Sequence, residues 1–399
     1  MPRRLPQLEF TALLALLFAI VAFSIDAMLP GLPEIAADLS PSDPNRAQLV
    51  LAAFVFGMGF GTLVSGPISD HFGRKPLILF GLLLYALGAI FAGLSHSMEM
   101  MLVGRVLQGF GAAFPRTVGV AMVRDLYEGR DMAKIISFVM TIFMLAPAVA
   151  PSVGALIIGS FGWHGIFASF VLLAVISALW FGLRQGETLA PENHRKLNPR
   201  DLIQGVRHVL GIYNVRLYIL ILTLGFAQMF SILSSVQQIY DQSFDLGASF
   251  PYWFGATAIL SAAGAVINGT LVTRLGMHVM IRLGYRIAAV ASLIALILNL
   301  TGVADASSFG FAVFFVWTVA MFFINAFTFG NLNALAMVPL GRMAGMGNSV
   351  IGALFTMGSV VIAVPVGLMF NGTPLPVMVA GLLCSGLALV LFRLERKEA

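Results

Sequence analysis

The chain has 399 residues, of which 59% are hydrophobic and 10% are charged, and 33 of them are Phe. A composition this apolar predicts a polytopic membrane protein, and a single cysteine excludes a disulfide scaffold or a cysteine-based metal cluster. The formal net charge of +5 would suit nucleic-acid binding, but the charges lie between apolar runs and not in one basic patch.

Twelve apolar runs of about 20 residues follow one another, each long enough to cross a hydrocarbon core of about 30 Å as a helix. Strand-like alternation is absent, so the fold class is all-α. The first run is too long for a signal peptide and is expected to be retained. The runs lie at roughly 8–30, 47–67, 76–95, 98–122, 134–159, 163–183, 214–238, 250–273, 280–302, 308–335, 344–370 and 373–393.

Loop charges separate onto two sides if the spans alternate in direction. One set of loops is rich in basic residues such as Arg74 and Lys75, whereas the other holds Glu34 and Asp38, with Arg46 as its only basic residue. This asymmetry predicts that both termini are cytoplasmic. Together with the lack of long extensions, it favours a bacterial inner membrane.

The long polar stretch between the sixth and seventh runs divides the chain into two halves. Pro199 can start a helix whose apolar residues share one face, which suits a segment lying on the membrane surface. The expected organisation is a six-helix bundle at 1–183, a cytoplasmic linker with an interfacial helix at 184–213, and a second six-helix bundle at 214–399.

The two halves look like copies of one unit. The segment GPISDHFGR at 66–74 returns as GTLVTRLGM at 269–277, with both core glycines kept and Asp70 replaced by Thr273. A repeated six-span unit is typical of carriers that work by alternating access.

The turn after the second run resembles the signature of the major facilitator superfamily, G-x-x-x-D-(R/K)-x-G-R-(R/K). It matches at Gly66, Asp70, Gly73, Arg74 and Lys75 and departs at His71. In that family the cluster latches the cytoplasmic side, so the resemblance implies a gate of Gly66, Asp70, Gly73, Arg74, Arg124 and Asp125. The alternative is that the basic residues only anchor a cytoplasmic loop.

Three further segments resemble the Bcr/CflA drug-resistance branch of that superfamily. They are DAMLPGLP at 26–33, GRVLQGFGAA at 104–113 and APAVAPSVGA at 146–155. The resemblance covers the whole chain and implies two pseudo-symmetric six-helix bundles. It also implies drug export in exchange for protons.

Three charged residues lie deep inside spans: Asp26, Arg105 and Arg116. Each costs about 2.5 to 3.5 kcal/mol at the centre of a membrane helix, so each needs a partner, water or a function. Asp26 and Arg105 are expected at similar depth, where they could approach across a cavity. Arg116 lies on almost the same helix face as Arg105, about 16 Å nearer the cytoplasm.

A carboxyl group gains or loses a proton when its hydration and charged neighbours change. The hypothesis is therefore that Asp26 is the proton site and Arg105 its modulator, with Gln108 one turn away in support. Alternatively, Asp26 caps a broken helix end or forms a fixed pair, and Arg105 binds backbone carbonyl groups. Arg116 belongs either to the substrate pathway or to the cytoplasmic gate.

The fifth run carries two prolines four residues apart, Pro147 and Pro151, among small residues that include Gly154. The prolines remove two backbone hydrogen bonds from one face, and the small residues let another helix approach. A hinge or leak-tight seam is favoured over packing alone.

The second half has no ionisable residue deep in a span, so proton coupling is assigned to the first half. The amides of Gln108, Gln228 and Asn325 are expected along the substrate pathway, together with Phe23 and Met144 from the first half. Each of these can equally be a core or lipid-facing residue.

No enzyme constellation, metal-ligand pairing or phosphate-binding motif is found, so neither an enzyme nor a cofactor is expected and energy must come from a proton gradient. The sequence predicts a proton-driven exporter of small amphipathic compounds including drugs, monomeric and free of nucleic acid. The alternatives are a carrier of one metabolite, as exporter or symporter, and a membrane receptor or scaffold.

Overall fold

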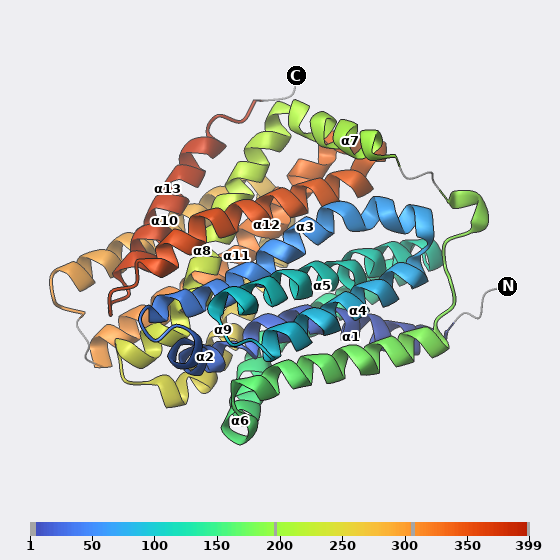
Figure 1. Ribbon diagram of the computed structural model, residues 1–399. Helices are drawn as coiled ribbons and strands as arrows, with labels where there is room; N and C mark the ends of the chain where they lie inside the picture. Colours follow the sequence, from blue (N-terminus) through green and yellow to red (C-terminus); the bar gives the residue numbers. More distant parts are fainter. Residues whose placement is uncertain (1–4, 195–197, 305–307, 397–399) are drawn as a thin grey trace. The chain divides into compact units, whose positions relative to one another are not determined.

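The computed structural model describes residues 5–194, 198–304 and 308–396. These residues form helices and the turns between them (Figure 1), and eleven segments are long and apolar enough to cross a membrane. One of them, α6 (Gly129–Arg184), has 56 residues, more than twice what one crossing needs, and its backbone leaves the helical region at Gly162. Because α6 supplies two spans, the all-α, twelve-span prediction is confirmed.

The chain divides into two compact units between Gly205 and Val206, inside α7 (Pro199–Gly211). This helix lies where the sequence predicts a helical segment in the linker. Besides α6, the first unit consists of α1 (Gln7–Asp26), η1 (Leu29–Gly31), α2 (Leu32–Leu39), η2 (Pro44–Gln48), α3 (Leu49–Phe72), α4 (Arg74–Gly93), α5 (Met98–Leu126) and η3 (Pro191–Asn193).

The second unit is built around α8 (Tyr213–Gln242), which is largely buried and packs against α11, α12 and α13. Its other elements are η4 (Gly247–Ser249), α9 (Phe250–Leu275), α10 (Met277–Leu300), α11 (Ser308–Met337), η5 (Val338–Met343), α12 (Ala344–Leu368) and α13 (Leu375–Phe392).

The first span is shorter than the predicted run at 8–30, because α1 ends at Asp26. Pro30 and Pro33 lack the amide hydrogens that would continue the helix, so the chain turns through η1 into α2. Two carboxylates of α2, Glu34 in its first turn and Asp38 near its end, hold the break in α6. The Trp163 amide donates to Glu34 Oε2 at 3.1 Å, and its indole Nε1 donates to Asp38 Oδ2 at 2.7 Å.

The two ends of each unit are hydrogen-bonded to each other. In the first unit Arg184, at the end of α6, donates from Nε and a terminal nitrogen to the carboxylate of Glu9 in α1, both at 2.8 Å. In the second, the Asn214 amide donates to the Arg396 carbonyl at 2.9 Å and accepts from its N–H at 3.1 Å. The last span of each unit is thus tied to the first.

Helices α3 and α5 lie in backbone contact at Gly109. A Cβ atom built there would come within 1.9 Å of the Phe54 carbonyl oxygen, so no side chain fits without separating the helices. We expect Gly109→Ala to lower the stability of the protein by about 1 to 3 kcal/mol through overpacking. Thermal unfolding in detergent measures the effect.

Gly159→Ala is the matched control, because a Cβ at this helical glycine meets nothing within 4 Å. Alanine has the higher helix propensity by about 1 kcal/mol, so this variant should unfold at the same temperature or higher. Equal destabilisation by both substitutions would contradict the assigned contact.

Candidate functional site

Asp26 is the last residue of α1, and only 5% of its surface is exposed. Within the described residues its carboxylate makes no hydrogen bond and no ion pair. Among the described residues it makes no hydrogen bond to the carbonyl groups that the end of α1 leaves free, so Asp26 does not cap α1. It is a buried acid without a partner among the described residues, an arrangement that costs free energy and marks functional positions in membranes.

Arg105 of α5 is completely buried and does not pair with Asp26. Its Nε donates to the Val50 carbonyl at 3.1 Å, one terminal nitrogen to the Ser24 carbonyl at 3.0 Å, and the other to Gln108 Oε1 at 2.7 Å. The structure thus shows the backbone binding that was the alternative prediction. Because Ser24 lies two residues before Asp26, Arg105 holds the end of α1 in place.

Aromatic groups complete the surroundings of Arg105. Its guanidinium carbon lies 4.6 Å from the ring centroid of Phe54, and Tyr85 of α4 shares a 2.6 Å hydrogen bond with the Ser24 hydroxyl. Gln108 presents a buried Nε2 that has no hydrogen-bond partner among the described residues. The network therefore joins α1, α3, α4 and α5 beside Asp26.

The proline-containing part of α6 packs against the same place. A Cβ built at Gly154 would lie 2.1 Å from the Ala27 carbonyl oxygen, so α6 and the end of α1 touch through their backbones. Pro151 is buried and Pro147 half-buried on the same helix, which continues through both. The predicted hinge therefore lies next to Asp26.

The remaining predicted pathway residues of the first half are more scattered. Arg116 is half-buried, and one of its terminal nitrogens lies 3.7 Å from Met58 Sδ. Phe23 packs edge-to-face on Phe170 with ring centroids 5.7 Å apart, whereas Met144 is 45% exposed. Of these three, Phe23 lies one helical turn from Asp26.

In the second half, the structure does not join Gln228 to Asn325 by any hydrogen bond in the described part of the chain. Gln228 is buried and accepts a 2.7 Å hydrogen bond from the Ser385 hydroxyl of α13. Asn325 is half-buried on α11. Gln228 therefore joins α8 to α13.

The predicted gate residues gather around Arg74. Its guanidinium donates to Asp70 Oδ1 at 2.6 Å, to Asp125 Oδ2 at 3.0 Å and to the Ser69 hydroxyl at 2.5 Å. Arg74 is 7% exposed, whereas the side chains of Asp70 and Asp125 are 35% and 21% exposed, so the cation is buried and its two partners reach the surface. The cluster links the turn between α3 and α4 to the end of α5.

Two other predicted gate residues lie at the edge of this cluster, and a third sets its backbone. Arg124 is exposed, and the Gly66 carbonyl accepts from Ser69 Oγ at 2.8 Å. Gly73 has φ of 100°, which glycine adopts without strain and other residues rarely do. That turn starts α4 and places Arg74 at its first position.

Glu187, in the linker, is a functional residue that the sequence reasoning missed. Its Oε1 accepts from the Arg74 N–H and its Oε2 from the Lys75 N–H, both at 3.0 Å. A carboxylate at a helix N-terminus satisfies free N–H groups and opposes the positive end of the helix dipole. The linker holds a second glutamate, Glu192, and no local sequence pattern distinguishes Glu187 from it.

We expect Glu187→Ala to reduce stability by about 1 to 2 kcal/mol, because α4 loses its N-terminal carboxylate. It should also free the start of the linker for proteolysis. Glu192→Ala is the control, since Glu192 is an exposed acid five residues further on. Limited proteolysis and thermal unfolding test the pair, and identical behaviour would contradict the role of Glu187.

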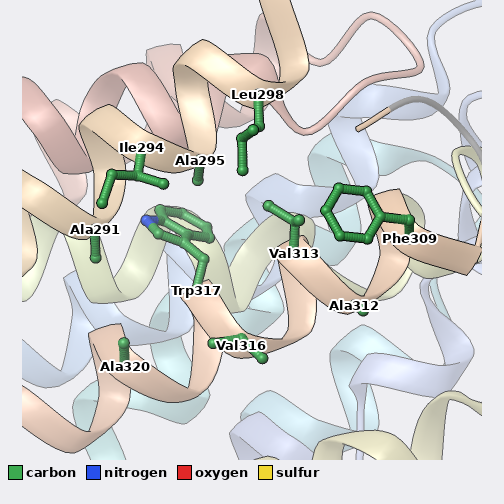
Figure 2. A pocket seen from close by; sticks show the side chains of 10 residues that line it. All are labelled: Ala291, Ile294, Ala295, Leu298, Phe309, Ala312, Val313, Val316, Trp317 and Ala320. Carbon is green, nitrogen blue, oxygen red and sulfur yellow. The ribbon is translucent and has the colours of Figure 1, made fainter. Parts of the chain in front are cut away.

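Figure 2 shows a groove of about 380 Å³ between α10 and α11, lined by apolar side chains that include Ile294, Leu298 and Val313. Trp317 extends across it from α11 and donates from Nε1 to the Ser292 hydroxyl at 3.0 Å. The groove contains none of the predicted site residues. It offers no charged or catalytic group among its lining residues.

Comparison with known proteins identifies the family of the chain. The family described as Major Facilitator Superfamily matches residues 14–364. The bicyclomycin resistance protein homolog of Haemophilus influenzae is 31% identical over 88% of this chain and 87% of its own length. The multidrug resistance protein MdtL of Shewanella oneidensis is 29% identical over 82% of this chain and 81% of its own.

Among solved structures, one described as a D-xylose-proton symporter matches with a TM-score of 0.77 and 13% identity. It covers 96% of this chain and 97% of its own. At that identity the match shows a shared fold alone. From the family match and the two relatives, the chain is a multi-pass secondary transporter of the major facilitator superfamily, similar to its Bcr/CflA drug-resistance branch.

Proposed function

We propose that the protein exports small amphipathic compounds, drugs among them, in exchange for protons. The observation that carries this proposal is Asp26, a buried carboxyl group with no protein partner in the described residues, at the end of a membrane-spanning helix. A carboxyl group in such a place can take up a proton in one conformation and release it in another that hydrates it differently.

The class of substrate is proposed from the relatives. The names of the Haemophilus and Shewanella proteins refer to bicyclomycin resistance and to multidrug resistance. The deep charges of the first half are compatible with neutral or cationic compounds, because Asp26 can exchange a proton for such a ligand. Phe23, one turn before Asp26, supplies an aromatic surface beside it.

Proton and substrate movement are coupled because the two compete for Asp26. Arg105, held by the Val50 and Ser24 carbonyl groups, keeps the end of α1 in position while the proton moves. Gly154, on the same helix as the two prolines, makes the backbone contact with the end of α1 that must shift when the hydration of Asp26 changes. The Arg74 cluster then closes the cytoplasmic side in one of the two states.

The environment proposed for this cycle is a bacterial inner membrane, with both termini in the cytoplasm and the protein acting as a monomer. The loop charges support this orientation, because basic residues such as Arg74 and Arg184 lie on the side assigned to the cytoplasm. A carrier of one specific metabolite remains the competing function, and the same experiment separates the two.

The test is substrate-induced proton release from the purified, detergent-solubilised protein in weak buffer. Bicyclic antibiotics, phenicols, lipophilic cations and small metabolites are added in turn, and a pH dye is followed. Release of protons on adding amphipathic compounds is the expected result. Binding of such a compound without release would overturn antiport, and release with a single metabolite alone would favour the competing function.

A further inference from the structure

A second cavity, of about 680 Å³, lies in the second unit where α8 and α10 begin and α11 and α13 end. Three arginines line it, Arg282, Arg393 and Arg396, together with His278. The one carboxylate among its lining residues is Glu395. The cavity is therefore strongly cationic, and the export cycle does not use it.

Glu395 does not neutralise these arginines. Its Oε1 accepts from the Tyr218 hydroxyl and lies 2.8 Å from His278 Nε2. Within the described residues the three arginines make no ion pair; Arg282 stacks over Phe392 at 5.5 Å instead. Their guanidinium groups keep N–H donors for a ligand.

The chain segment that carries two of these arginines is fixed in place. Asn214 binds both backbone polar groups of Arg396, and the Tyr213 hydroxyl donates to the Leu394 carbonyl at 3.2 Å. The Arg396 guanidinium lies 4.2 Å from the Tyr213 ring centroid. A site whose backbone is already held loses less entropy when a ligand binds.

The other wall of the cavity is apolar, formed by Leu335, Val338, Pro339 and Phe392. Because the cavity lies at the ends of membrane spans, this wall continues towards the hydrocarbon region while the arginines lie at headgroup level. A ligand that fits both walls has an anionic head and an apolar body.

We propose that this cavity binds a phosphate ester, and its position favours the headgroup of an anionic phospholipid as the source. Arginine is suited to this because its planar guanidinium donates two parallel hydrogen bonds to phosphate oxygens. The proposal goes beyond drug and proton exchange and does not depend on it. The other source of the same chemistry is a soluble phosphate.

The experiment is native mass spectrometry of the full-length protein in detergent, titrated with phosphatidylglycerol or with phosphatidylcholine of the same acyl chains. We expect phosphatidylglycerol to bind more tightly, and Arg282→Gln/Arg393→Gln to weaken its binding by about tenfold or more, since charged hydrogen bonds are lost. Inorganic phosphate and glycerol 3-phosphate are then added as competitors. Displacement of the lipid by them indicates a soluble source, and no displacement indicates the headgroup.

The matched control is Arg274→Gln/Arg286→Gln, which removes the same charge from exposed positions that do not line the cavity. Circular dichroism and gel filtration without lipid verify that each variant is folded, and Arg282→Lys/Arg393→Lys should retain part of the binding. Equal binding of both lipids, equal binding by the glutamine variant and the wild type, or an equal loss in the control would overturn the proposal.

Discussion

Asp26→Asn protein is expected to bind substrate, release no protons and lose uphill export. At a membrane potential of about 100 mV, one proton supplies about 2.3 kcal/mol, which sustains a roughly 50-fold concentration ratio. Asparagine has nearly the same shape but cannot exchange a proton. The concentration ratio of a neutral compound across the membrane should therefore fall to about one. Drug accumulation in vesicles with an imposed proton gradient measures this loss.

The control for this variant is Asp43→Asn, which makes the same chemical change at an exposed loop carboxylate. It should export as the wild type does. Uphill export by Asp26→Asn at the wild-type ratio would show that the proton is carried elsewhere. Proton release from the purified variant gives the same answer without a membrane.

Arg105→Met is expected to destabilise the protein by about 3 to 5 kcal/mol. Methionine fills much of the volume but donates no hydrogen bond, so the Ser24 and Val50 carbonyl groups and Gln108 lose the donors that now bind them. The stability of Arg105→Lys should lie between those of the wild type and Arg105→Met, because one ammonium group cannot reach all three acceptors. Thermal unfolding in detergent and yield after gel filtration are the measurements.

Arg46→Met is the control, because Arg46 forms an exposed ion pair with Glu99 at 2.7 Å and should contribute less than about 1 kcal/mol. Comparable destabilisation by the two substitutions would contradict the assigned network. If Arg105→Lys remains folded and binds substrate but its proton release is altered, Arg105 acts on Asp26 as well as on the fold.

The class of fold could be predicted from the sequence because the apolar composition and the length of a run identify a membrane span. The twelve apolar runs correspond to helices, and most ends differ by a few residues. The largest difference at the first run arises at Asp26, where Pro30 and Pro33 end the α-helix earlier than hydropathy suggests. Apolar character continues past that point, so hydropathy alone does not show the break.

The site was predicted less completely, because spacing along one helix does not say which neighbour a side chain meets. Asp26 and Arg105 are at comparable depth, yet Arg105 turns to the carbonyl groups of Ser24 and Val50. Backbone acceptors leave no mark in a sequence, since every residue has one. Glu187 was missed for a related reason, because its partners are backbone N–H groups, those of Arg74 and Lys75 among them.

The hydrogen bonds that join the ends of each unit bear on how such a chain arises and how it tolerates rearrangement. Glu9 holds Arg184 in one half, and Asn214 holds Arg396 in the other, so each half is closed by its own side chains. Neither closure needs the peptide that joins the halves. A gene duplication followed by fusion would therefore deliver two self-contained halves, and a circular permutant that encodes the second half first would retain every one of these contacts.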